Sequence, residues 1–213
     1  PPEFSRKGPA GAVSPEQRNE IYYKLNHFVT TFYHQKLLSA DGKIAREYFS
    51  ARGVSEETIK KESLGYAPAE WAELYDFLVS KKAPLEKAEE LGLIRRKSDA
   101  AANASGNVAG RTHYDFFRHR VMFPVLDLRG RVIAFGARKL GDEEGPKYLN
   151  SAESPIFKKG SGFYGLFRAQ KDIRAEDICV VVEGFMDCLS LQQAGVPYAV
   201  ATLGTALSSR QIQ

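Results

Sequence analysis

The 213-residue chain contains 30 Lys and Arg, 26 Asp and Glu, and 43% hydrophobic residues, a composition that predicts a soluble globular protein with a buried core. No apolar run approaches the roughly 18 residues needed to span a bilayer, so we expect no membrane partner. Two cysteines in a chain of this length exclude a disulfide framework, and we expect Cys179 and Cys188 to be buried, inert thiols of a reducing compartment.

Charge is unevenly distributed along the chain. Residues 111–174 contain 13 Lys and Arg against seven Asp and Glu, a net charge of +6. Residues 175–213 contain one Lys or Arg against four Asp and Glu, a net charge of −3. A basic segment beside an acidic one suits a site that binds a polyanion and also a cation. A basic segment is equally typical of a solvated surface, so charge alone leaves both interpretations open.

The first half of the chain is predicted to be mostly helical. Residues 1–14 are rich in Pro and Gly and predict a linker or the remnant of an expression tag. Pro15 follows Ser14 as at the start of a helix, and apolar residues then recur at helical spacing as far as Leu38. Further elements are predicted as helices over 42–51, from Ser55, around 70–80 and around 84–91, as an extended connector at 63–68 and as a surface loop at 98–110.

From Arg120 the pattern changes to strands. Residues 121–127 and 131–138 predict a hairpin, and residues 147–150 are extended. Residues 178–183 and 198–202 predict two parallel strands, the first buried on both faces, joined by a helix over 185–194, and another helix is predicted from Ser208. The predicted fold class is therefore an α+β N-terminal part, helices followed by a small mixed or antiparallel sheet, and then an incomplete parallel α/β unit.

The stretch V-V-V-E-G-F-M-D places two carboxylates where the first parallel strand ends. Glu183 lies at the carboxyl end of that strand, where open α/β sheets bind ligands, and Asp187 follows one helical turn later. Gly184 between them permits a tight turn and close approach of a ligand. Two carboxylates suit Mg²⁺, which binds one or two of them together with phosphate oxygens and water. On spacing alone, Glu183 could equally cap the following helix.

Cations alternate with aromatic residues in the basic segment. This is the composition of a groove for single-stranded nucleic acid, in which cations follow phosphates and rings stack on bases. Most of the phenylalanines are expected in the core instead. Lys147 and Tyr148, in a short polar stretch, are the better candidates for contact with a ligand.

Five motifs, in this order, resemble bacterial DNA primase, and the resemblance covers about residues 15–213. They are F-R-H-R-V-M-F-P-V-L-D-L-R-G-R-V-I-A-F-G-A-R, P-K-Y-L-N-S-A-E-S-P-I-F-K-K-G, L-F-R-A, V-V-E-G-F-M-D and A-V-A-T-L-G-T-A-L-S. The resemblance implies a basic primase-core subdomain over 15–174. It implies the first β–α–β part of a Toprim subdomain, a metal-binding α/β fold, over 175–213.

The resemblance also implies roles for individual residues. Glu183 and Asp187 would be the catalytic carboxylates that bind Mg²⁺ or Mn²⁺, and it stays open whether Glu183 is also a general base. The loop beside the metal would contain Gly184, Thr202 and Gly204. The cleft for template and nucleotide would be lined by Arg52, Arg120, Arg138, Lys147, Tyr148, Asn150 and Lys158.

The implied activity of the parent enzyme is synthesis of short RNA primers on single-stranded DNA from ribonucleoside triphosphates, at replication forks in the bacterial cytoplasm. The family's next acidic motif, its zinc-binding domain and its helicase-binding domain would lie outside this chain. We therefore expect zinc, the replicative helicase and the single-strand binding protein to bind elsewhere in the parent, and the chain alone to be inactive. A non-catalytic nucleic-acid-binding module and a phage-type primase–helicase remain alternatives.

Overall fold

The computed structural model describes residues 15–97, 110–141, 145–204, 207 and 211. The predictions for residues 1–14, for nearly all of the loop at 98–110 and for a helix from Ser208 lie outside these residues. No described helix is long and apolar enough to cross a membrane.

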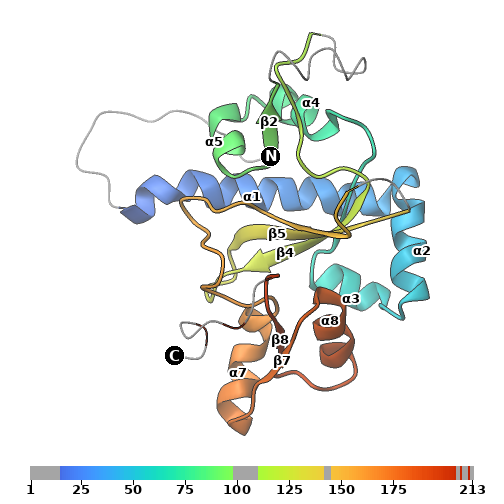
Figure 1. Cartoon of the computed structure of the whole chain (residues 1–213), viewed down its shortest axis with the longest axis vertical. Coiled ribbons are helices and arrows are strands. Elements are labelled where there is room, and N and C mark those ends of the chain that lie inside the picture. The colour runs from blue at the N-terminus through green and yellow to red at the C-terminus, as the bar shows by residue number, and fades with distance from the viewer. Residues whose placement is uncertain (1–14, 98–109, 142–144, 205–206, 208–210, 212–213) are drawn as a thin grey trace.

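Helices come first along the chain, then a four-stranded antiparallel sheet, then a parallel β–α–β unit (Figure 1). The first helical elements are α1 (Pro15–Leu38), η1 (Ala40–Gly42), α2 (Lys43–Ala51), α3 (Glu56–Lys61), α4 (Glu73–Ser80) and α5 (Leu85–Glu90). The main sheet contains β1 (Gly65–Ala67), β4 (Arg120–Leu126), β5 (Val132–Lys139) and β6 (Tyr148–Asn150). The other elements are β2 (Ile94–Arg96), β3 (His113–Asp115), α7 (Leu166–Glu176), β7 (Val180–Val182), α8 (Phe185–Gln193) and β8 (Ala199–Ala201).

The predicted helices are confirmed, and their sequences explain where they form. On α1, Leu25, Val29 and Phe32 recur one helical turn apart and are all buried. The helix α3 begins after Ser55, whose hydroxyl oxygen accepts a hydrogen bond from the backbone N–H of Thr58 at 3.1 Å. This is an N-cap, and it places the start of α3 where the sequence predicted it.

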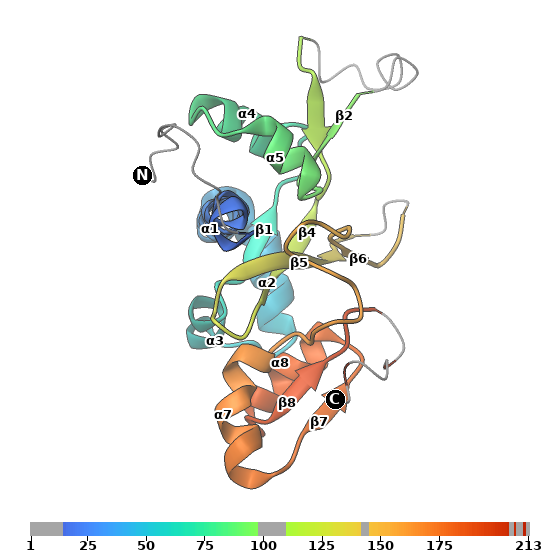
Figure 2. The same ribbon diagram turned by 90° about the vertical axis from the view of Figure 1, so that its left-hand side faces the viewer.

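The main sheet has the strand order β1-β4-β5-β6, with all neighbours antiparallel. The predicted hairpin is β4–β5, and its turn is held by the Asp127 carboxylate, which accepts hydrogen bonds from the backbone N–H groups of Arg129 and Arg131 at 2.9 Å. The stretch 63–68 is not merely a connector, because β1 pairs with β4 along it. Helix α1 runs across the sheet and is seen end-on beside it in Figure 2.

Besides β1, strands β2 and β3 and helix α7 escaped prediction from the sequence. Strands β2 and β3 form a separate two-stranded antiparallel ribbon, with Ile94 opposite Asp115. Each has only three residues, too few for a periodic pattern. Helix α7 is largely polar, with Ala169 its one buried residue among those described, so it shows no broad apolar face.

The β–α–β unit is parallel as predicted, with Val180 opposite Ala199. The prediction that its first strand is buried on both faces is wrong. Val181 is 42% exposed and Ile178 is 49% exposed. Within the described residues β7 pairs only with β8, whereas β8 also pairs with Tyr164 on its other side. The outer strand therefore keeps apolar side chains on the surface.

The two cysteines differ from one another. Cys188 is buried, and burial raises the pKa of its thiol to about 12, as expected of an inert thiol. Cys179 is exposed, so the prediction that both thiols are buried is wrong. Its position just before the exposed strand β7 explains the difference.

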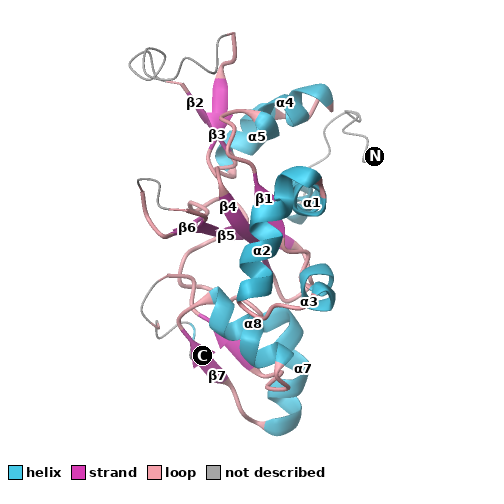
Figure 3. Ribbon diagram, turned by 90° about the vertical axis from the view of Figure 1, so that its right-hand side faces the viewer, coloured by secondary structure: helices cyan, strands magenta, loops and turns pink. Residues whose placement is uncertain are grey.

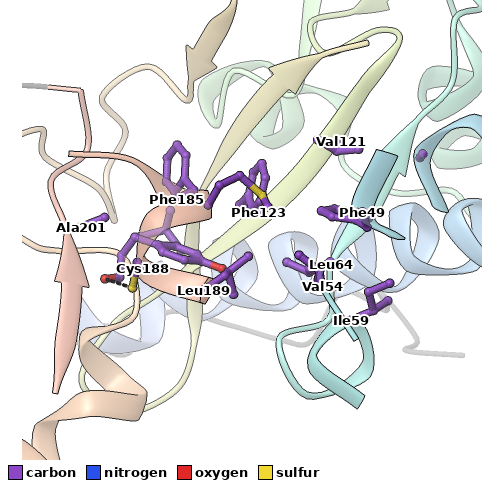
Figure 4. Packing of buried hydrophobic residues seen from close by; sticks show 14 of the residues in the cluster. Phe49, Val54, Ile59, Leu64, Val121, Phe123, Phe185, Cys188, Leu189 and Ala201 are labelled. Atoms are coloured by element: carbon purple, nitrogen blue, oxygen red, sulfur yellow. Dashed lines mark hydrogen bonds between the residues drawn. The ribbon is translucent and has the colours of Figure 1, made fainter. Parts of the chain in front are cut away.

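Hydrophobic residues pack on both faces of the main sheet. Along β4, Val121 and Phe123 belong to one cluster and Met122 to the other, as the alternation of a strand requires. The cluster of Phe123 continues into the β–α–β unit through Phe185 and Leu189 (Figure 4). One uninterrupted core therefore joins the main sheet to the unit that bears the two carboxylates.

Phe185 is the central contact of this shared core. Its ring stacks on that of Phe123, with centroids 5.1 Å apart, and meets the Tyr164 ring edge-on at 5.0 Å. Gly136 on β5 makes room for it, since a Cβ atom added at Gly136 would lie 2.2 Å from Cζ of Phe185. A residue without a side chain is needed at this position.

We predict that Gly136→Ala destabilises the fold by about 1–3 kcal/mol, because the added methyl group overlaps the Phe185 ring. Urea unfolding followed by circular dichroism measures the change. Gly162→Ala is the matched control, since a Cβ atom there has no neighbour within 4 Å. It should alter the unfolding free energy by no more than about 0.5 kcal/mol. Equal effects of the two substitutions would contradict this packing.

Candidate active site and nucleic-acid interface

The two carboxylates lie where β7 ends and α8 begins. Glu183 follows β7 directly, Gly184 is the N-cap residue of α8, and Asp187 lies in the first turn of that helix. Both carboxylate side chains are exposed. A Cβ atom added at Gly184 would lie 2.7 Å from Oδ2 of Asp187, so the glycine lets that carboxylate approach the start of the helix. The sequence prediction of two carboxylates at one strand end matches this arrangement.

The loop after β8 is tied both to β7 and to the main sheet. The backbone N–H of Thr202 donates to the carbonyl of Val182 at 3.0 Å. The side-chain amide of Asn150 donates to the carbonyl of Leu203 at 2.9 Å. A Cβ atom added at Gly204 would lie 2.8 Å from that amide nitrogen. Asn150 therefore fixes the loop beside the carboxylates against β6.

Arg138 and Tyr148 lie on the sheet face that bears the β–α–β unit. They are opposite each other in the β5–β6 register, and Cζ of Arg138 lies 5.9 Å from the Tyr148 ring centroid. The centroid of the Tyr148 ring lies 6.4 Å from that of the Phe185 ring. Phe185 lies between Glu183 and Asp187 in the sequence. Arg52, at the end of α2, reaches the same region, because it and Arg138 both stack on Tyr48. The structure therefore gathers Arg52, Arg138, Tyr148 and Asn150 near the carboxylate edge.

Arg120 lies on the opposite face of the sheet. It pairs in register with Lys139, while its neighbour in the β4–β5 ladder, Val121, pairs with Arg138. Because side chains alternate along a strand, Arg120 and Arg138 face opposite ways. The one cleft expected from the sequence is therefore divided by the sheet into two basic surfaces.

The second basic surface is a cavity of about 640 Å³. Its lining includes Trp71, Arg95, Tyr114, Arg118, Arg120 and Lys139. The guanidinium carbon of Arg118 lies 4.0 Å from the Trp71 ring, and that of Arg95 lies 4.3 Å from the Phe116 ring. Cations interleaved with aromatic rings are typical of surfaces that bind single-stranded nucleic acid.

Of the residues that line this cavity, the sequence predicts only Arg120 as a binding residue. Arg120 is just 7% exposed, and its guanidinium donates a hydrogen bond to the carbonyl of Pro146 at 3.0 Å. The spacing of Arg118 and Arg120 two residues apart was an available signal. Trp71 and Arg95 come from other elements, and only the fold brings them there.

The two remaining predicted lysines are exposed. Lys147 immediately precedes β6, and its carbonyl accepts a hydrogen bond from the backbone of Lys139 at 3.0 Å. Lys158 lies on the segment between β6 and α7, and its carbonyl accepts from the Ser161 hydroxyl at 2.7 Å. In the described part of the chain, no hydrogen bond or ion pair joins either lysine to Glu183 or Asp187.

Asp115 forms hydrogen bonds to the segment that contains Trp71 and the start of α4. Its carboxylate accepts hydrogen bonds from the backbone N–H groups of Leu74 and Tyr75, at 2.8 and 2.9 Å, and so caps α4 from β3. Its own N–H donates to the carbonyl of Trp71 at 2.8 Å. Burial raises the pKa of Asp115 to about 7, although the two amides and Arg118 act in the opposite direction.

The two carboxylates at this edge match the number of ligands that a protein commonly supplies to a hydrated divalent cation. No group of three or more His, Cys, Asp or Glu side chains converges among the residues that the structure describes. Glu183 and Asp187 supply two exposed carboxylates at one edge. Mg²⁺ is commonly bound by one or two carboxylates, with waters and substrate phosphates completing the octahedron.

Comparison with known proteins identifies the family. The sequence model described as "DNA primase catalytic core, N-terminal domain" matches residues 32–170. The chain belongs to the DNA primase family. The model described as "Toprim domain" matches residues 177–213 of this primase chain.

Full-length relatives and solved structures agree with this family. A DNA primase of Synechococcus elongatus is 43% identical over 198 residues, which cover 92% of this chain and 27% of the relative. A DNA primase of Pseudomonas aeruginosa is 40% identical over 208 residues, covering 97% of this chain and 30% of the relative. The chain thus spans less than a third of either relative.

Solved primase structures have the same fold. The DnaG primase catalytic domain bound to ssDNA has a TM-score of 0.80 at 39% identity, covering 93% of this chain and 60% of that one. The RNA polymerase domain of Mycobacterium tuberculosis primase DnaG has a TM-score of 0.80 at 32% identity, covering 90% and 59%. The mixed α/β architecture expected from the sequence is therefore that of the primase catalytic core.

The raised pKa of Asp115 makes stability depend on pH in a defined direction. Because the pKa lies near 7 in the folded state against an ordinary 3.8, the folded chain holds this proton more tightly. The contribution of Asp115 to the free energy of unfolding is therefore present at low pH and is lost as pH rises from about 4 to about 7.

We predict that the unfolding free energy of the unaltered chain, relative to Asp115→Asn, falls over this pH range by at most about 4 kcal/mol. Urea unfolding of both chains at several pH values measures the difference. A difference that stays constant or grows with pH would contradict the burial argument.

Proposed function

We propose that this chain is part of a primase that synthesises short RNA primers on single-stranded DNA from ribonucleoside triphosphates. The observation that carries the proposal is the position of Phe185, which lies between Glu183 and Asp187 in the sequence. Its ring belongs to the shared core and lies 6.4 Å from the ring of Tyr148, which in turn lies 5.9 Å from Cζ of Arg138. Cations and carboxylates on one face suit phosphoryl transfer, which depends on positioning and charge neutralisation. The relatives named DNA primase support the same activity.

Glu183 and Asp187 would hold Mg²⁺, or Mn²⁺ in its place. When bound, the metal would neutralise phosphate charge and activate the attacking hydroxyl. Gly184 keeps the approach to the carboxylates open, and the loop with Thr202 and Gly204 forms the adjacent wall. Glu183 as a general base remains a second possible role.

The basic residues would bind the other reactants. Arg52, Arg138, Tyr148 and Asn150 adjoin the carboxylate edge and are proposed to contact nucleotide or primer phosphates. Arg120, with the cavity around Trp71 and Arg118, is proposed to hold the DNA template, because its cations are interleaved with aromatic rings. A relative of the same fold is bound to ssDNA. Lys147 and Lys158, both exposed, are proposed to add positive charge that attracts the template and the nucleotide.

We further propose the division that the sequence suggested, a basic subdomain over 15–174 and a Toprim part over 175–213. Other segments of the parent primase would supply more acidic ligands, a zinc-binding domain and contacts with the replicative helicase and single-strand binding protein. The parent would act at replication forks in the bacterial cytoplasm.

We predict that Glu183→Gln, in a primase that contains this chain, lowers primer synthesis at least about a hundredfold, because a metal-binding carboxylate is lost. Affinity for single-stranded DNA should stay within about threefold, since the template contacts lie elsewhere. Primer synthesis on a single-stranded template and fluorescence anisotropy give the two readouts.

Glu176→Gln, an exposed carboxylate on α7, is the matched control and should leave synthesis unchanged. Full synthesis by the Glu183 variant would overturn the catalytic proposal. If DNA binding persisted in that case, the result would favour a non-catalytic binding module. Robust synthesis by the 213-residue chain alone would contradict the expectation that it is inactive.

We also predict that Lys139→Ala weakens binding of oligo(dT) by about three- to tenfold and lowers the slope of log K against log salt by about one. The reason is loss of one phosphate contact in the cavity that Lys139 shares with Arg120. Lys171→Ala, at an exposed site on α7, should change neither quantity. Equal effects of the two lysines would indicate nonspecific attraction rather than a defined groove.

A further inference from the structure

Two guanidinium groups lie over the ring of Tyr48. Cζ of Arg138 is 4.6 Å from the centroid of its ring, and Cζ of Arg52 is 5.4 Å from it. Cζ of Arg138 also lies 5.9 Å from the centroid of the Tyr148 ring, so two tyrosine rings contact this guanidinium. Guanidinium groups at such distances are attracted to the faces of aromatic rings.

The ring connects a helix with the sheet. Tyr48 and Arg52 are four residues apart on α2 and share one helix face, whereas Arg138 comes from β5. The end of α2 is itself held by α8, because the side-chain amide of Gln193 donates to the carbonyl of Gly53 at 2.7 Å. Figure 3 shows α2 adjoining α8 on this side of the molecule. Both arginines are thus fixed relative to the helix that begins at the two carboxylates.

No carboxylate neutralises these arginines in the described part of the chain. Neither Arg52 nor Arg138 has an ion pair there, and Nε of Arg138 is buried without a hydrogen-bond partner among the described residues. A glutamate in place of Tyr48 would also hold both groups, but it would cancel part of their charge. An aromatic face orients guanidinium groups and leaves their charge available to an external anion.

The hydroxyl group of Tyr48 is buried and forms no hydrogen bond among the described residues, so the ring makes the contacts of this side chain. Burial raises the pKa of Tyr48, although Arg138 and Arg52 act to lower it. The side chain is therefore a neutral phenol at physiological pH, and it meets the arginines through its ring.

We propose that Tyr48 is a positioning residue whose ring holds Arg52 and Arg138 in the orientation that binds phosphate groups beside the carboxylate edge. The inference rests on the proposed function, which makes this face the site of nucleotide or nucleic-acid phosphates. Tyr48 itself need not touch the ligand. The recognised chemistry is a phosphate oxygen, whether from a nucleotide or from single-stranded DNA.

The test compares variants of the 213-residue chain in two binding assays. One measures anisotropy of labelled oligo(dT), and the other measures binding of a labelled ribonucleoside triphosphate with Mg²⁺, so that the phosphate source is distinguished. The variants are Tyr48→Leu, Tyr48→Phe, Arg52→Ala, Arg138→Ala and the double variant Tyr48→Leu with Arg138→Ala. Tyr23→Leu is the matched control, because Tyr23 stacks on Arg131 at 3.8 Å outside both basic surfaces.

Tyr48→Leu is expected to weaken at least one of the two ligands by about tenfold, as loss of a desolvated cation–π contact predicts. Tyr48→Phe, which keeps the ring, should restore affinity to within about threefold. The double variant should bind clearly more tightly than the product of the single effects predicts, because Tyr48 acts through Arg138. Tyr23→Leu should bind as the unaltered chain does.

Two different failures can be told apart. If Arg138→Ala weakens binding but Tyr48→Leu does not, or if their effects multiply independently, the positioning role is overturned and the proposed function stands. If neither Arg138→Ala nor Arg52→Ala weakens either ligand, the proposed phosphate-binding face itself fails.

A second measurement covers the case in which Tyr48→Leu does not fold. In the unaltered chain with isotope-labelled arginine and tyrosine, the Nε–H resonance of Arg138 should carry a ring-current shift and should move on saturation with the phosphate ligand. The Tyr48 ring resonances should move with it. An Arg138 resonance that is insensitive to both ligands would overturn the inference.

Discussion

The arrangement of the site depends on the packing of one aromatic ring. Phe185 stands between Gly184 and Asp187 in the sequence, and its side chain is inserted between Gly136 and Phe123 of the main sheet. The residue that anchors the β–α–β unit is therefore the middle one of the three residues that separate the two carboxylates. Any shift of that ring would move the carboxylates relative to the cations on β5 and β6. The hydrophobic core thus sets the geometry of a polar site.

The sheet determines which cations can act with these carboxylates. Because successive residues of a strand face opposite ways, Arg138 joins the carboxylate face while Lys139 faces the cavity around Trp71. Asn150 on β6 then fixes the loop after β8 to the carboxylate face. The same few strands consequently build two basic surfaces, one proposed to bind reacting phosphates and one proposed to bind a template strand.

The sequence allowed the long elements to be predicted, since α1, the β4–β5 hairpin and the parallel β–α–β unit have clear periodicity. It also allowed the carboxylate pair to be predicted, because Glu183 and Asp187 are close in the chain. It did not reveal β1 as a strand, the exposure of Val181, or the separation of Arg120 from Arg138. These depend on strand pairing, on how many strands flank β7, and on register, all of which involve residues distant in sequence. The cavity around Trp71 was missed for the same reason, as its lining comes from several elements.

The central claim is that the carboxylate edge shares a face with Arg138 and Tyr148, while the cavity around Trp71 lies on the other. Titration of the isotope-labelled chain with Mn²⁺, followed by paramagnetic broadening of its NMR signals, tests this claim most directly. We predict broadening first at Gly184 and Phe185, then at Arg138 and Tyr148, with the Trp71 indole spared. Broadening of the Trp71 indole before Tyr148, or broadening with no preferred position, would contradict it.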